Sequence, residues 1–148
     1  YNQLEYKQVG SNNKSLISLA KNLDVNEKCF FLGSVEDWRP YICNSDFLIA
    51  PSSEEGLNLS VIEASAFGLI PILSKRKCLN EHKRLGKDVI WLDDIDPYSI
   101  YKKIISLNYF IYKNLDDSKE RISNNSYNYY SSEKLIPQLL NIYTSCMK

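Results

Sequence analysis

The chain has 148 residues, and its 18 Lys and Arg balance its 18 Asp and Glu to a formal net charge of zero. This length is typical of one domain, and 44% hydrophobic with 24% charged residues excludes a disordered, collagen-like or coiled-coil chain. A zero net charge argues against nucleic-acid partners, and no apolar run of the sequence reaches the ~20 residues that cross a bilayer. We therefore expect a cytoplasmic protein.

Short apolar runs alternate with amphipathic stretches along most of the chain. The apolar runs predict strands at 4–9, 28–32, 46–50, 70–73 and 89–92. Helical spacing of apolar residues predicts helices at 16–23, 36–43, 59–67 and 79–85. Continuous apolar strands that alternate with helices are typical of a parallel sheet covered on both faces. The predicted fold class is therefore α/β, with a Rossmann-like parallel sheet flanked by helices.

The last third of the chain has a helical pattern only. Apolar residues at helical spacing predict helices around 100–110 and 135–143, while the polar, Tyr- and Asn-rich segment 114–132 predicts a weaker helix and a turn. We expect one domain over 1–148, in which 97–148 form a helical C-terminal part.

The four cysteines and the single histidine give little sign of metal or redox chemistry. Cys29, Cys43, Cys78 and Cys146 form no C-x-x-C pair, so we expect reduced thiols and no metal site. His82 lies in the basic stretch 75–87, where we expect it to be at least partly exposed. A solvated basic face is the default interpretation of this stretch, and attraction to anionic lipid headgroups is the alternative.

The segment 51–58 is the most informative candidate site. Ligands of an open parallel sheet bind beyond the carboxyl ends of its strands, where 33–35, 51–58 and the residues from Ser74 onward are expected. Residues 51–58 contain Glu55 and lead into the helix that carries Glu63. Main-chain N–H groups and the helix dipole favour a phosphate there, and carboxylates accept hydrogen bonds from hydroxyls. Phosphate and hydroxyls together describe a nucleotide-sugar, although solvent-exposed glutamates at this spacing also occur by chance.

Several short segments occur in a familiar order: 31–35, 46–51, 55–57 with Glu63-Ala64, and 67–72. In this order the chain resembles the C-terminal, donor-binding domain of a GT-B glycosyltransferase, most similar to glycosyltransferase family 4 (group 1). Glu55 and Glu63 match its E-x7-E motif. The resemblance runs from about Gly10 through Pro97, and 130–134 with 139–143 resembles the family's last helix.

The resemblance implies a role for each candidate residue. Glu55 would be the catalytic residue that hydrogen-bonds the transferred sugar, and Glu63 would take the ribose hydroxyls. The nucleotide-sugar would further contact two groups of residues: Gly33, Ser34 and Val35 beside the base, and Gly56, Leu57, Asn58 and Leu59 at the diphosphate. Family members are retaining hexosyltransferase-type enzymes that typically use no metal, so we expect no cofactor and a nucleotide-diphosphate sugar, with a UDP-sugar favoured, as the donor.

The resemblance also implies partners and missing parts. The expected acceptor is a glycan or a lipid-linked molecule in polysaccharide biosynthesis, which adds the inner face of the membrane as a peripheral location. The N-terminal acceptor domain and an Arg/Lys pair would precede Tyr1, so we expect the isolated chain to bind a nucleotide-sugar without turning it over. Asn58 stands where Gly or Pro is usual, and 75–81 replace the usual Gly-Gly-x-Pro-Glu loop. These departures keep open a non-catalytic, degenerate GT-B-like module that scaffolds or regulates a partner.

Overall fold

The computed structural model describes residues 4–11 and 14–146. The chain divides into two compact units, Tyr1–Asn44 and Ser45–Lys148. The expectation of one domain over 1–148 stays a prediction.

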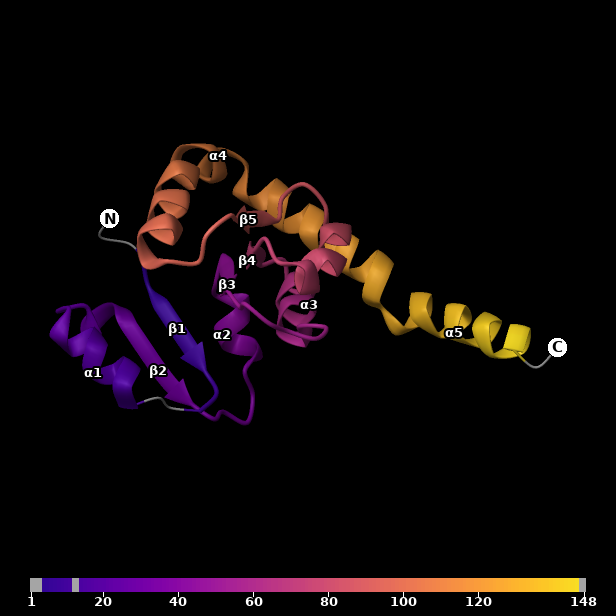
Figure 1. Cartoon of the computed structure of the whole chain (residues 1–148), viewed down its shortest axis with the longest axis horizontal. Helices are drawn as coiled ribbons and strands as arrows, with labels where there is room; N and C mark the ends of the chain where they lie inside the picture. Colours follow the sequence, from indigo (N-terminus) through magenta and orange to yellow (C-terminus); the bar gives the residue numbers. More distant parts are fainter. Residues whose placement is uncertain (1–3, 12–13, 147–148) are drawn as a thin grey trace. The chain divides into compact units, whose positions relative to one another are not determined.

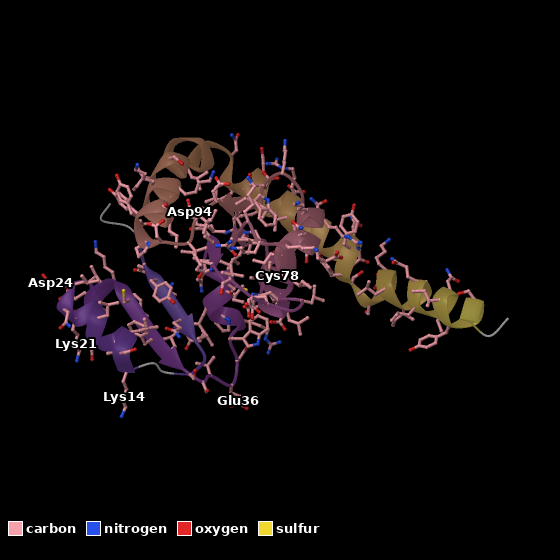
Figure 2. All side chains as sticks on the ribbon, viewed as in Figure 1. Lys14, Lys21, Asp24, Glu36, Cys78 and Asp94 are labelled. Carbon is pink, nitrogen blue, oxygen red and sulfur yellow. The ribbon has the colours of Figure 1, made fainter. Side chains whose placement is uncertain are left out.

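The first unit contains two parallel strands and short helical segments (Figure 1). β1 pairs with β2 with Tyr6 opposite Cys29. The side chains of Lys14 and Lys21 on α1 point away from both strands (Figure 2). The elements in chain order are β1 (Tyr6–Val9), α1 (Lys14–Asn22), the 3-10 helix η1 (Asn26–Lys28), β2 (Cys29–Gly33) and α2 (Arg39–Cys43).

The second unit is built on a three-stranded parallel sheet in the order β3-β4-β5. Its elements are β3 (Phe47–Ala50), α3 (Leu59–Ala66), β4 (Ile70–Ser74), the 3-10 helix η2 (Lys77–Leu85), β5 (Ile90–Leu92), α4 (Pro97–Tyr130) and α5 (Ser132–Cys146). All five expected strands form and all their pairings are parallel, which confirms the α/β class. The strands form two hydrogen-bonded sheets, β1-β2 in the first unit and β3-β4-β5 in the second.

The sheet of the second unit is covered on both faces because its central strand alternates its side chains between two apolar clusters. Ile70 and Ile72 of β4 pack with β5 and with the first half of α4, whereas Leu73 packs with α3, η2 and Ile122 of the second half of α4. Every residue of β4 is buried. The carboxyl edge of this sheet, from which the loops after β3 and β4 emerge, is therefore fixed to a packed apolar core.

α3 lies in this core on the face formed by Val61, Ala64 and Ser65, all of them 0% exposed. It ends before Gly68, whose φ of +84° belongs to the left-handed region that glycine adopts without strain. A Cβ at Gly68 would lie 3.2 Å from the carbonyl oxygen of Lys119. Gly68 thus lets α4 approach α3 closely.

The segment 114–132 is better ordered by tertiary contacts than its composition predicts. α4 continues through it to Tyr130, and its two halves meet at a kink at Asn114, where φ is −135° (Figure 1). Polar side chains of the second half donate to main-chain carbonyls of α3 and η2: Ser123 to Ala66 (2.8 Å), Asn125 to Leu85 (2.8 Å) and Ser126 to Ile62 (3.2 Å). The expected helix and turn are both present, with the turn at Ser131 between α4 and α5. The polar residues of the helix bind main-chain carbonyls of other elements.

His82 is buried, contrary to the expectation that it is at least partly exposed. In a 3-10 helix every third residue lies on the same side, and Leu79, His82 and Leu85 of η2 are all 0% exposed. The sequence interpretation used α-helical spacing, which placed His82 with its basic neighbours. Its ring lies 6.5 Å from the ring of Tyr130, and neither ring nitrogen has a hydrogen-bond partner in the described part of the chain.

Burial of His82 predicts a loss of stability in mild acid. Desolvation lowers the pKa of its imidazole, more than nearby Glu81 raises it. The unfolded chain then binds the proton first, so the folded state loses up to about 1.4 kcal/mol per pH unit below the ordinary pKa of about 6.5. Urea unfolding at pH 7.5 and pH 5 should show this loss in the wild type and not in His82→Leu. Equal pH dependence of both proteins would contradict the buried, neutral histidine.

Asp88 and Arg121 join the loop before β5 to α4. Arg121 donates from Nε to Asp88 Oδ2 at 2.9 Å and from its terminal nitrogen to Oδ1 at 2.7 Å, and Ser118 Oγ donates to Oδ1 at 2.9 Å. The hydrogen bonds from Arg121 hold the pKa of the Asp88 carboxyl below its ordinary value, against the opposing effect of its burial. The ionised, paired carboxylate therefore stabilises the fold.

Asp88→Ala should lower the free energy of unfolding by about 1.5–3 kcal/mol near neutral pH, because Arg121 and Ser118 lose a charged acceptor. Since its folded pKa is lowered, the contribution of Asp88 is complete above the unfolded value of about 3.9 and disappears as pH falls through the folded pKa. Asp94→Ala is the matched control, since Asp94 is an exposed carboxylate on the following loop (Figure 2). Equal urea midpoints for the two variants at pH 7 would refute this role.

Candidate functional site

The loop 51–58 leaves the sheet at the carboxyl end of β3 and enters α3. Ala50, the last residue of β3, pairs with Leu73 of β4, so the loop begins at the same edge as the residues that follow Leu73. A cleft of about 550 Å³ opens here, lined by the end of β3, the loop and the first turn of α3. The sequence-predicted residues that line it are Glu55, Leu57, Asn58 and Leu59.

The main-chain N–H groups at the entrance of α3 are available to a ligand. Those of Leu57, Asn58 and Leu59 donate to no acceptor within residues 4–11 and 14–146. This is the ordinary state of the first turn of a helix, whose N–H groups have no partner inside the helix. The partial positive charge of the helix N-terminus adds to their attraction for an anion.

Glu55 and Glu63 are both exposed carboxylates. Glu55 lines the cleft and accepts a hydrogen bond from Ser52 Oγ at 2.7 Å. Glu63 lies one turn inside α3 and is not part of the cleft lining. Neither forms an ion pair with any residue that the structure describes, so both can accept hydrogen bonds from a ligand.

The remaining predicted residues are not among those that line the cleft. Gly56 is exposed in the loop and is not one of the lining residues. Gly33, Ser34 and Val35 belong to the first unit, where Gly33 ends β2 with a φ of +70° and its carbonyl accepts from Gly10 N–H at 2.9 Å. Ser34 is exposed and Val35 is half-buried. Their predicted contact with a base stays a prediction.

Asn58 caps α3. Its side-chain Oδ1 accepts from Val61 N–H at 3.3 Å, and its own carbonyl accepts from the same N–H at 3.1 Å. The cap therefore occupies one of the four N–H groups that a helix start leaves open. An anion at this site would be bound by the N–H groups that precede Val61.

The basic residues after β4 are not part of the cleft. Lys75 Nζ lies 2.9 Å from Asp93 Oδ1, and this hydrogen bond holds the pKa of the Asp93 carboxyl below its ordinary value. Neither Lys75 nor Arg76 lines the cleft, so the geometry of the cleft gives them no part in phosphate binding.

Two serines at the site were missed by the sequence analysis. Ser52 lines the cleft and donates to Glu55, and Ser74, at the end of β4, donates from Oγ to the main-chain carbonyl of Ser52. The signal for both was their position at the carboxyl ends of adjacent parallel strands, which meet at one edge of a sheet. Hydroxyl groups there are near the site whatever their spacing in sequence.

Two absences concern the described part of the chain. Among the residues whose side chains the structure describes, no three His, Cys, Asp or Glu side chains are grouped to hold a metal ion. No helix of the same residues is long and apolar enough to pass through a membrane. The expectations of metal independence and of no cofactor stay predictions.

Comparison with known proteins identifies the family. A model of the family described as Glycosyl transferases group 1 matches residues 2–108. The chain therefore belongs to the glycosyl transferases group 1 family. This confirms the resemblance on which the assignment of the E-x7-E motif depends.

Individual relatives agree with this assignment. An uncharacterized glycosyltransferase of Haemophilus influenzae is 40% identical over 82 residues, which are 52% of this chain and 23% of the relative. A glycosyltransferase of Rickettsia africae superposes with a TM-score of 0.82 at 18% identity, over 99% of this chain and 41% of its own. An Anabaena protein in complex with UDP superposes with a TM-score of 0.84 at 15% identity, over 98% of this chain and 42% of its own. The chain thus spans about two fifths of the length of these solved structures.

The Asn58 cap predicts a graded effect on stability. Asn58→Ala should lower the free energy of unfolding by about 1 kcal/mol, and Asn58→Gly by only a few tenths, because glycine is itself a tolerated N-cap residue. Urea denaturation measures both values. Asn80→Ala, an exposed asparagine on η2, is the control and should match the wild type. A loss for Asn58→Gly as large as that for Asn58→Ala would contradict the capping role.

Proposed function

We propose that the chain is the donor-binding part of a retaining, metal-independent glycosyltransferase. The observation that carries the proposal is the cleft at the carboxyl end of β3, where Glu55 and unpartnered N–H groups lie on one loop. The donor is a nucleotide-diphosphate sugar, with UDP as the favoured nucleotide. The complex of the Anabaena relative with UDP supports this choice.

In the proposed complex the diphosphate binds at the start of α3. The N–H groups of Leu57, Asn58 and Leu59 donate to its oxygens, and Gly56 lets the main chain approach them. Glu63 accepts from the ribose hydroxyls, and Gly33, Ser34 and Val35 flank the base. As the bond to the sugar breaks, negative charge grows on the departing diphosphate, and fixed donors stabilise such charge more than they stabilise the ground state.

Glu55 is the proposed catalytic residue because it lines the cleft, where its carboxylate would contact the transferred sugar. Hydrogen bonds from sugar hydroxyls to a carboxylate are worth about 1.5–3 kcal/mol each. They orient the sugar for reaction with an acceptor, which we propose to be a glycan or a lipid-linked molecule in polysaccharide biosynthesis. Turnover then depends on further parts of a longer protein, since the chain spans about two fifths of its solved relatives.

We also propose a cytoplasmic location, at the inner membrane face when the acceptor is lipid-linked. The basic stretch 75–87 would supply the attraction to anionic headgroups. Within it, Lys75 pairs with Asp93, and Arg84 pairs with Glu81 at 3.1 Å. The attraction to headgroups would therefore come from the other basic side chains of the stretch.

A non-catalytic module that scaffolds or regulates a partner is the second candidate. The observation that favours it is the Asn58 cap, which occupies the Val61 N–H that a catalytic phosphate site can otherwise use. This candidate predicts no preference for a nucleotide that carries a sugar.

Calorimetric titration with UDP and UDP-glucose tests the proposal and separates the two glutamates. Glu63→Ala should weaken both ligands about tenfold or more, because it removes the ribose acceptor. Glu55→Ala should weaken only the sugar-bearing ligand, by a similar factor. Glu54→Ala is the matched control: Glu54 is exposed in the same loop but does not line the cleft.

Three results would count against the proposal. Absence of binding by the wild type at millimolar ligand would exclude a donor site. Equal losses for bare UDP in both glutamate variants would contradict their separate roles. A wild-type protein that binds UDP and UDP-glucose equally, with Glu55→Ala unchanged, would favour the non-catalytic module.

A further inference from the structure

Two neighbouring carbonyls of the loop 51–58 lie close to side chains of β4 and η2. Ser74 Oγ donates to the Ser52 carbonyl, and Cys78 Sγ lies 4.0 Å from the Ser53 carbonyl oxygen. Cys78 is labelled in Figure 2. The Ser74 side chain is 0% exposed, so this hydroxyl does not exchange its partner with water.

A short chain of contacts leads from Ser74 to the carboxylate at the cleft. Ser74 fixes the main chain of Ser52, and the Ser52 hydroxyl donates to Glu55 Oε1 at 2.7 Å. Ser74 itself does not line the cleft. A change at Ser74 can therefore reach a ligand only through the loop, and first through Ser52 and Glu55.

This link is important because the loop has few other restraints. Its N–H groups at Leu57, Asn58 and Leu59 have no acceptor among the described residues, and Gly56 is exposed with no atom within 4 Å of an added Cβ. A loop whose donors stay open for a ligand needs its position fixed through its carbonyls. The Ser74 hydrogen bond is the buried contact that does so.

We infer that Ser74 is a positioning residue: through the Ser52 carbonyl it holds the loop 51–58 and sets where the Glu55 carboxylate meets the transferred sugar. The claim that Ser74 sets where Glu55 meets the sugar rests on the proposed function. The claim that Ser74 holds the loop does not, because it concerns the protein without a ligand. It assigns part of donor recognition to the last residue of β4, directly before the segment 75–81 in which this chain departs from the family pattern.

The test compares Ser74→Ala with two further variants. Ser74→Thr keeps the hydroxyl and should rescue the effect. Ser126→Ala is the matched control, because Ser126 is also a buried serine, 2% exposed, whose hydroxyl donates to a main-chain carbonyl, that of Ile62 in α3. Thermal unfolding first establishes that each variant is folded.

The first readout needs no ligand. Backbone ¹⁵N relaxation should show increased motion of residues 52–58 in Ser74→Ala, and wild-type values in Ser74→Thr and Ser126→Ala. Unchanged relaxation of the loop in Ser74→Ala would overturn the inference, whatever the protein binds.

The second readout is the ratio of the affinities for UDP-glucose and UDP. Ser74→Ala should reduce this ratio about three- to tenfold, and Ser74→Ala combined with Glu55→Ala should reduce it no further than Glu55→Ala alone, because both act through one carboxylate. A looser loop with an unchanged ratio, or additive losses in the double variant, would overturn the inference. Increased loop motion in Ser74→Ala, together with no binding of either ligand by the wild type, would support the claim that Ser74 holds the loop and would refute the proposed function.

Discussion

The connection between β3 and α3 has to meet two opposing demands. The N–H groups at Leu57, Asn58 and Leu59 have no protein acceptor in the described part of the chain, which a proposed anion site requires. A loop with open donors has few main-chain bonds to fix it. The structure meets the two demands with different groups: the loop's N–H groups stay open at the cleft, while the Ser52 carbonyl accepts a hydrogen bond from the buried Ser74 hydroxyl of β4.

The same division continues along α3. Its first turn is free toward the cleft except at Val61, whose N–H is capped by Asn58. It is also fixed by α4, because the hydroxyls of Ser126 and Ser123 donate to the carbonyls of Ile62 and Ala66. The helix and the loop are therefore held by α4 and β4 through their carbonyls, while their N–H groups at the cleft stay open. Family membership and this geometry together support donor binding as the function of the loop.

The sequence predicts the parts of the molecule that depend on local pattern. Continuous apolar runs located all five strands, and the loop with Glu55 was found from its place after β3. Periodicity failed at His82, which is buried because η2 is a 3-10 helix. The polar segment after Asn114 is helical as expected, but its pattern does not reveal that its side chains bind carbonyls of other elements. The position of Ser74 at a strand end was predictable, but its hydrogen bond to Ser52, 22 residues away in sequence, was not.

The central claim is that the N–H groups at the start of α3 bind the diphosphate of a nucleotide donor. An NMR titration of the ¹⁵N-labelled protein with UDP tests it most directly, because each of these groups gives its own signal. We expect the largest shifts on the amides of Leu57, Asn58 and Leu59, and we expect these three signals to saturate together. Saturation with UDP that leaves these three signals unmoved, while other amides shift, would contradict it.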